Sequence, residues 1–200
     1  MKALIFSDIH GDLMALNKLM DVEADWYFAA GDTVSWAKGF ERVGPALQRR
    51  GGRVCVLPGN HESEADTRAM ADRYGLRHFH GEHMELDGVH VAGLGYSTPT
   101  PFDTPGEYGE PEMAERLARF ESLKPLILIC HAPPLKTALD EAGLGRHFGS
   151  RAVREFVERN QPKWFFCGHI HEAAGRQIQI GSTHAVNVGK KGFLLDFANL

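Results

Sequence analysis

The first third of the chain alternates short apolar runs with amphipathic segments of helical period. Runs of four or five apolar residues are typical of buried strands, and apolar residues three and four positions apart are typical of helices that pack on one face. Strand–helix order at this spacing predicts parallel strands joined by crossover helices packed against a sheet. The expected strands are residues 3–6, 26–29 and 53–57, and the expected helices are residues 13–22, 40–50 and 62–74.

The remainder of the chain adds hairpin strands and two more helices. Asp87-Gly88 lies between two apolar runs and is a strong signal for a two-residue hairpin turn. The last three expected strands also look hairpin-like. Helices are expected at 112–122 and 150–160, and strands at 84–86, 89–92, 126–130, 164–167, 177–180, 183–188 and 193–197. Two parallel halves joined by hairpins predict two sheets packed face to face with helices outside, in a single domain over residues 1–200.

Composition excludes several classes of protein. Hydrophobic residues make up 43% of the chain and charged residues 24%, which is too apolar for a disordered protein. The net charge of −4 gives no general attraction for a nucleic-acid polymer or an anionic membrane, so neither is an expected partner. Three cysteines are too few, and odd in number, for a disulfide framework; with no signal-peptide pattern, we expect buried thiols in a cytoplasmic protein.

Each expected parallel strand is followed at once by side chains that bind metals. Ligands of open α/β sheets lie beyond the carboxyl ends of the strands, so these side chains are expected to converge on one place. The five motifs are Ser7-Asp8-Ile9-His10-Gly11, Gly31-Asp32, Gly59-Asn60-His61-Glu62, His131-Ala132-Pro133-Pro134 and Gly168-His169-Ile170-His171.

The types of donor indicate which ions such a place would hold. Carboxylates, imidazoles and one amide oxygen suit manganese, iron, cobalt, nickel or zinc, and they suit magnesium or calcium poorly. Seven donors are too many for one such ion, but they suit two ions that share a carboxylate. Two ions roughly 3.5–4 Å apart can clamp the attacking and leaving oxygens of a displacement at phosphorus and generate hydroxide near neutral pH.

These five motifs, in this order, resemble the calcineurin-like metallophosphoesterase family from about residue 3 to residue 171. The resemblance implies an α/β fold, a four-layer α/β/β/α sandwich of two packed mixed sheets with helices outside. The implied metal ligands are Asp8, His10 and His171 for the first ion, Asn60, His131 and His169 for the second, and Asp32 as the bridge.

The same resemblance gives two further residues a catalytic part. His61 matches the family's catalytic histidine, which is not a ligand and which protonates the leaving oxygen or stabilises charge on the phosphoryl group. Glu62 would orient His61, and it can also be read as an acid in the first turn of the helix that follows.

Two departures from the family's pattern exclude particular branches of the family. The protein Ser/Thr phosphatases carry Asp-Arg-Gly shortly after the Gly-Asp motif, whereas this chain continues with Ser35-Trp36-Ala37 and lacks that phosphate-binding arginine. Ser35 also stands where purple acid phosphatases place a metal-bound tyrosine. The chain also lacks room for the capping domain of the double-strand-break nucleases. It therefore resembles the small, single-domain bacterial and archaeal phosphodiesterases and phosphatases.

The sequence leads us to expect a dinuclear metal-dependent phosphoester hydrolase in which a metal-bridging hydroxide attacks phosphorus. Manganese is the first expectation for the two ions, with iron, zinc, nickel or cobalt as alternatives. The substrate would be a small phosphoester, with nucleotides among the candidates, and a diester is preferred because no arginine fork for a dianionic phosphate is evident. The open alternatives are a phosphomonoesterase, a nucleotide or dinucleoside polyphosphate hydrolase, and a non-catalytic metal-binding scaffold of the same fold.

Two other groups of residues have more than one reading. Residues 96–111 contain four prolines and are expected to form a long surface loop of the kind that covers a binding site. Aromatic residues in and near this loop could form a wall for an aromatic substrate group or simply pack the loop: Trp36, Tyr96, Phe102 and Tyr108. A second set of histidines follows no strand-end pattern and is expected at surface or partly buried positions: His78, His80, His83 and His90.

Overall fold

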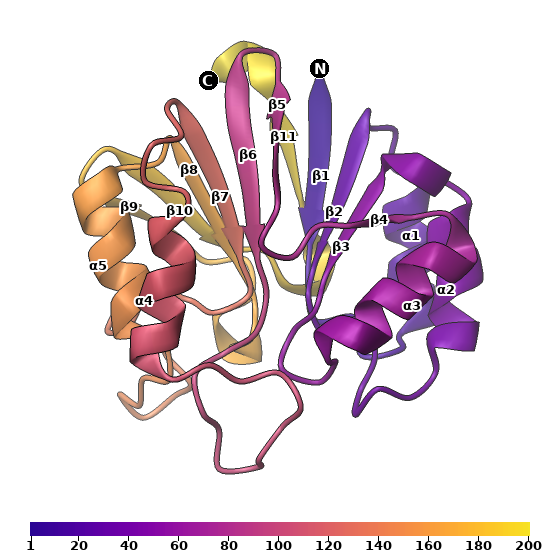
Figure 1. Cartoon of the computed structure of the whole chain (residues 1–200), viewed down its shortest axis with the longest axis horizontal. Helices are drawn as coiled ribbons and strands as arrows, with labels where there is room; N and C mark the ends of the chain where they lie inside the picture. Colours follow the sequence, from indigo (N-terminus) through magenta and orange to yellow (C-terminus); the bar gives the residue numbers. More distant parts are fainter.

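The computed structural model describes residues 1–200 and contains two mixed β-sheets that face each other, with helices on both outer sides (Figure 1). The strands are β1 Lys2–Phe6, β2 Trp26–Ala30, β3 Val54–Leu57, β4 Arg77–His78, β5 His83–Leu86, β6 Val89–Leu94, β7 Leu126–Cys130, β8 Trp164–Cys167, β9 Gln177–Ile180, β10 Thr183–Asn187 and β11 Phe193–Asp196. The α-helices are α1 Leu13–Asp21, α2 Phe40–Gln48, α3 Glu64–Tyr74, α4 Glu110–Ala118 and α5 Arg151–Asn160. The sheet orders are β11-β1-β2-β3-β4 and β5-β6-β7-β8-β10-β9.

Alternate residues of the central strands enter two different hydrophobic cores. In β1, Leu4 packs under the helices α1–α3, whereas Ile5 packs between the two sheets. In β7, Leu128 packs under α4 and α5, whereas Ile129 joins the same central core. Because both faces of these strands are buried, their sequences read as continuous apolar runs rather than as alternating patterns. Three cores separate four layers, which confirms the expected α/β/β/α sandwich.

The strand pairing confirms most of the sequence predictions. The strands β1, β2 and β3 are parallel to one another, and so are β6, β7 and β8. The hairpin β5–β6 turns at Asp87 and Gly88, whose φ angles of 48° and 75° are those of the favoured two-residue turn.

Two strands differ from the prediction. The segment β11 was expected beside the preceding hairpin strands, but it crosses to the other sheet and pairs antiparallel with β1. Its Leu195 thereby fills the central core, and a local apolar pattern does not tell which sheet edge a strand will join. The two-residue strand β4 was not predicted.

The start of α3 also differs, with a consequence for the site. Ser63 caps this helix: its hydroxyl accepts from the backbone N–H of Asp66, and the Asp66 carboxylate accepts from the backbone N–H of Ser63. The helix therefore begins at Glu64 rather than at Glu62. Glu62 lies outside the helix and is free to turn toward the strands.

The carboxyl ends of the parallel strands in both sheets point to the same end of the molecule, the lower side in Figure 1. The long segment 96–109, between β6 and α4, lies at this end as well (Figure 1). Inside its base, buried His80 lies 2.9 Å from the hydroxyl of Tyr108 and packs against Tyr96. All three cysteines are buried free thiols, and none of the helices combines the length and apolar character needed to span a membrane.

Candidate metal centre

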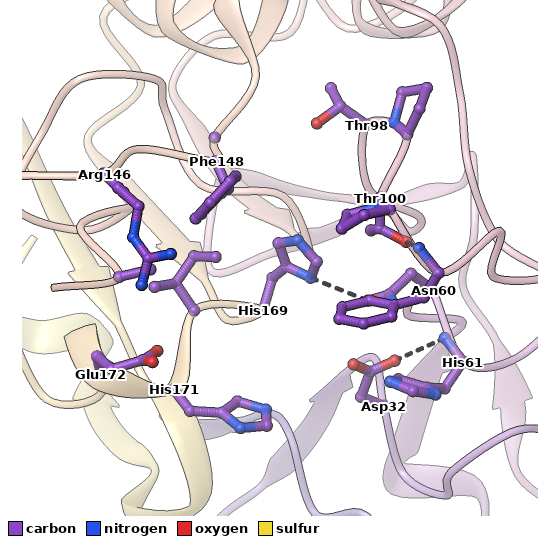
Figure 2. Close-up of a pocket in the computed structure, with 16 residues that line it drawn as sticks. Asp32, Asn60, His61, Thr98, Thr100, Arg146, Phe148, His169, His171 and Glu172 are labelled. Carbon is purple, nitrogen blue, oxygen red and sulfur yellow. Dashed lines mark hydrogen bonds between the residues drawn. The ribbon is translucent and has the colours of Figure 1, made fainter.

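The residues predicted from the five strand ends meet at one place. Their ligand atoms form three overlapping groups, within each of which all atoms lie within 4.8 Å of one another, and Asp32 belongs to two of these groups. The groups are Asp8–His10–His171, His10–Asp32–His61 and Asp32–His131–His169. The amide of Asn60 adds the seventh predicted ligand, and Figure 2 shows it facing His169 across the site.

Pairs of ring nitrogens and oxygens that carry lone pairs point at one another. The Nε2 atoms of His10 and His171 lie 3.0 Å apart. The Oδ1 atom of Asn60 lies 2.9 Å from Nδ1 of His169 and 3.3 Å from Nε2 of His131. Such a concentration of acceptors requires either protons or cations between them, and mixed nitrogen and oxygen donors suit divalent transition metals.

Hydrogen bonds on the far side of two rings fix which nitrogen faces the site. The Nδ1 atom of His131 lies 2.9 Å from the carbonyl oxygen of Ala30, so it carries a proton and donates it. The Nδ1 atom of His10 likewise lies 3.0 Å from the hydroxyl of Ser35. Both Nε2 atoms then face inward, in the arrangement that metal-binding histidines usually have. Ser35 therefore orients a predicted ligand, His10, from the position where the resemblance set a serine against the tyrosine of the purple acid phosphatases.

The long loop orients the amide of Asn60, which the sequence did not reveal. The Nδ2 atom of Asn60 donates to Oγ1 of Thr104 at 3.2 Å, and Thr104 in turn donates to the carboxylate of Glu107 at 2.5 Å. Because the amide nitrogen is occupied in this way, the amide oxygen faces the histidines. Only tertiary contact brings Thr104 to Asn60, and no local pattern signals that contact.

The backbone at the site adopts conformations that L residues seldom occupy. Asp8, His10, Asp32 and His169 have φ angles of 57°, 49°, 52° and 70°. Residues held in this way cluster at functional sites, where the surrounding structure determines their conformation. Four of the seven predicted ligands are thus aimed by tight turns at the strand ends.

Glycine is required where two of these turns approach each other. A Cβ atom at Gly59 would lie 2.0 Å from Oδ1 of Asp32, and one at Gly168 would lie 2.1 Å from Oγ of Ser7. Neither distance can be accommodated without moving a strand end. The small residues that flank the predicted ligands therefore allow the strand ends to approach one another closely.

The charges at the centre are strongly coupled. Burial alone would raise the pKa of Asp32, but the nearby His131 and His10 hold it well below its usual range. Burial would likewise lower the pKa of His131, but Asp32 raises it to about 9. Without a bound cation, this pair is an ion pair, and a metal ion would take the place of the proton on His131. Burial and the charge on His131 lower the pKa of His169 to about 4, which leaves that ring neutral.

Glu62 does not orient the ring of His61, as the sequence suggested, but binds the backbone at the ends of two strands. Its carboxylate is fully buried and accepts hydrogen bonds from the backbone N–H groups of Gly59, Asp32 and Val34 at 2.7, 3.0 and 2.9 Å, and from the hydroxyl of Thr33 at 2.8 Å. It therefore ties the end of β3 to the end of β2 and does not hydrogen-bond the ring of His61. Burial and the charge of Asp32 raise the pKa of Glu62 to about 7, against these four hydrogen bonds.

His61 lies beside the predicted ligands and is oriented by the backbone. Its own N–H donates to Oδ1 of Asp32 at 3.0 Å, and the N–H of Trp36 approaches its Nδ1 at 3.4 Å. The ring of Trp36 lies edge-on to it, with centroids 5.3 Å apart. Since Nδ1 accepts, Nε2 carries the proton of the neutral ring, which is the requirement for a proton donor.

A cleft of about 490 Å³ opens onto this centre. The predicted ligands Asp32, Asn60, His169 and His171 line it together with His61. Its walls are residues 98–102 of the long loop on one side and residues of the segment 142–149 on the other (Figure 2).

Of the four aromatic residues that the sequence singled out, two lie in or beside the cleft and two pack the loop. Phe102 lines it and Trp36 is exposed beside His61, whereas Tyr108 is buried and Tyr96 packs against Tyr108. Arg146, on the second wall, was not predicted, because nothing in its local sequence distinguishes it from a surface arginine.

Comparisons with known proteins identify the family of this chain. The family model described as calcineurin-like phosphoesterase matches residues 1–173, and the chain belongs to that family. The uncharacterized protein MJ1162 of Methanocaldococcus jannaschii is 30% identical over 204 aligned positions, which cover 98% of this chain and 91% of that protein. The protein is therefore classed as a metal-dependent phosphoester hydrolase.

Solved structures share the fold. The protein TT1561 of Thermus thermophilus superposes with a TM-score of 0.71 at 19% identity, over 94% of this chain and 88% of that one. The phosphopantetheinyl hydrolase PptH of Mycobacterium tuberculosis superposes with a TM-score of 0.69 at 16% identity, over the same shares of the two chains.

The residues fit the pair of divalent metal ions that the family implies. The inward nitrogens of His10 and His131 are fixed by bonds on their far sides, the amide oxygen of Asn60 is held inward by Thr104, and Asp32 is shared between two donor groups. This arrangement matches the chemistry of two ions that share a carboxylate.

Changing Glu62 to Gln should weaken metal binding without touching any predicted ligand. The amide keeps one acceptor oxygen but directs its N–H₂ at two of the four donors, so half of the hydrogen bonds that join the ends of β2 and β3 through this side chain would be lost. We expect the affinity for Mn²⁺ to fall by roughly 10–100-fold and the free energy of unfolding to fall by about 1–3 kcal/mol. Isothermal titration and thermal unfolding measure the two effects.

Glu64→Gln is the matched control, because Glu64 begins α3 and pairs only with the exposed Arg68. That variant should bind Mn²⁺ as the wild type does. Wild-type Mn²⁺ affinity in Glu62→Gln would show that the carboxylate does not support the centre.

Proposed function

We propose that the protein hydrolyses small phosphodiesters with two divalent transition-metal ions, manganese first, held by the seven predicted ligands. The observation that supports this most is that Asp32 lies between two donor groups, with its Oδ2 3.6 Å from Nε2 of His10 and 3.4 Å from Nε2 of His131. When bound, the ions would activate water as the nucleophile and neutralise charge on the phosphoryl oxygens. The ligands are Asp8, His10 and His171 for one ion, Asn60, His131 and His169 for the other, and Asp32 for both.

The protein's own groups supply the rest of the chemistry. His61 faces the cleft beside Asp32 and, with Nδ1 occupied, can give the proton on Nε2 to the leaving oxygen. Glu62 acts on the reaction indirectly, by holding the loop that carries Asp32 against the loop that carries Asn60. Asp8 accepts from the backbone N–H of His169 at 3.0 Å and so ties the first group of ligands to the second.

The preference for a diester needs a different argument from the one that the sequence offered. That argument relied on the lack of an arginine, but Arg146 lines the cleft. Because one guanidinium can form a fork of two N–H bonds to a phosphate, the absence of an arginine no longer supports a diester. The cleft of about 490 Å³ has walls on both sides of the predicted ligands, so it has room for organic groups on both sides of a phosphoryl group.

The choice of ester is testable with one pair of chromogenic substrates. Protein loaded with Mn²⁺ should hydrolyse bis-p-nitrophenyl phosphate with a higher kcat/KM than p-nitrophenyl phosphate, because the second aryl group gains contact with the walls of the cleft. Release of p-nitrophenolate measures both rates. A faster monoester would make the protein a phosphomonoesterase, and turnover of neither would favour a metal-binding scaffold.

Changing His61 to Ala should lower kcat for the diester by roughly 10²–10⁴-fold, the usual contribution of a proton donor. The metal content should stay at two ions per chain, measured by elemental analysis. The metal content is needed as a second readout because His61, His10 and Asp32 have ligand-type atoms within 4.8 Å of one another, so His61 could itself bind an ion. A matched His83→Ala variant, changed at an exposed position in β5, should be unaffected. Loss of one ion in His61→Ala would make His61 a ligand, and an unchanged kcat would remove it from the mechanism.

A further inference from the structure

Two aromatic side chains are exposed on the walls of the cleft. Phe102 is 70% exposed in the segment 98–102, and Phe148 is 46% exposed in the segment 142–149. Neither belongs to any of the three hydrophobic cores. The exposed parts of these rings contribute no buried area to the fold, and exposed aromatic side chains are typical of the lining of ligand clefts.

The segment that carries Phe148 is anchored at its base. Asp140 is fully buried, and its carboxylate accepts from the backbone N–H groups of Thr137 and Gly149 at 2.8 and 2.9 Å. The Nδ1 atom of His147 lies 2.8 Å from the same carboxylate. The contacts of the Asp140 carboxylate hold together the two ends of the segment 136–149, the recognition loop.

The tip of the recognition loop presents a cation to the cleft. The N–H of Ala142 donates to the carbonyl of Arg146 at 2.9 Å, and the N–H of Arg146 donates to the carbonyl of Gly143 at 3.1 Å, which closes a tight turn. Arg146 is the only lysine or arginine that lines the cleft, and no carboxylate lies within 4.0 Å of its guanidinium. Figure 2 shows Arg146 and Phe148 together on one wall, with Glu172 beyond Arg146.

We propose that this wall and the segment 98–102 form a subsite for the base of a nucleotide ester. Phe148 and Phe102 offer aromatic faces on which a nucleobase stacks, and Arg146 offers a positive charge to the attached phosphate. A purely apolar substituent would offer no hydrogen-bond donor to the carboxylate of Glu172, which also lines the cleft, whereas a base has donor groups on its edge. The assignment rests on the proposed function, because it places the phosphate of the same molecule against the predicted metal ligands.

Binding of two ligands that differ only in the base isolates the subsite. The probes are a non-hydrolysable phosphonate analogue of AMP and the corresponding analogue of ribose 5-phosphate, titrated calorimetrically into Mn²⁺-loaded protein. We expect the AMP analogue to bind at least roughly tenfold more tightly, the usual effect of stacking one base on an aromatic side chain. Equal dissociation constants would overturn the proposal.

Two variants should change binding in different ways. Phe148→Ala should bring the two dissociation constants within about twofold of each other by weakening only the AMP analogue. Arg146→Gln should weaken both analogues by the same factor, roughly threefold, because both carry the anionic group. Leu144→Ala is the control: Leu144 is 96% exposed on the same loop but does not line the cleft, so both constants should stay as in the wild type. Equal weakening of both analogues by Phe148→Ala would also overturn the base subsite.

Failure of the subsite and failure of the proposed function give different results. Hydrolysis of the diester together with equal dissociation constants would refute only the base subsite. Base-dependent binding without hydrolysis of any ester would refute only the proposed function.

Discussion

The candidate site depends on a buried carboxylate that is held between imidazoles from two different sheets. Asp32 follows β2 in one sheet, while His131 follows β7 in the other, and only the packing of sheet on sheet brings them to 3.4 Å. Hydrogen bonds between the sheets fix the same alignment: His131 donates to the carbonyl of Ala30, and the N–H of His169 donates to the carboxylate of Asp8. The central core between the sheets therefore also sets the geometry of the predicted metal ligands.

A centre built in this way has to hold buried charges without losing stability. An unpaired buried carboxylate costs several kcal/mol in order-of-magnitude terms, so each acid at the site has donors around it. Asp8 accepts from the N–H of His169, Asp32 from the N–H of His61, and Glu62 from three backbone N–H groups and a hydroxyl. These bonds join the loops that follow the strands into one rigid rim, which is the preorganisation that chemistry at phosphorus requires.

Local apolar patterns, together with the rule that ligands lie beyond the carboxyl ends of parallel strands, were enough to predict most strands and the predicted metal ligands. Buried apolar runs gave the strands of both sheets, and the residues that follow them gave all seven predicted ligands, because parallel strands end at the same edge. Partners that meet only through tertiary packing were not predicted: the bond between Asn60 and Thr104, the recognition loop with Arg146, and the crossing of β11 to the other sheet. Glu62 was noticed but misread, since the capping of α3 by Ser63 turns it toward β2 and away from His61.

The most direct test is diffraction from crystals grown with manganese, recorded at the absorption edge of that metal. The account predicts two anomalous peaks per chain, one among Asp8, His10 and His171 and one among Asn60, His131 and His169, with the Asp32 carboxylate between them. A map with no peak between Asp32, His131 and His169 would contradict the shared-carboxylate centre on which the proposed chemistry depends.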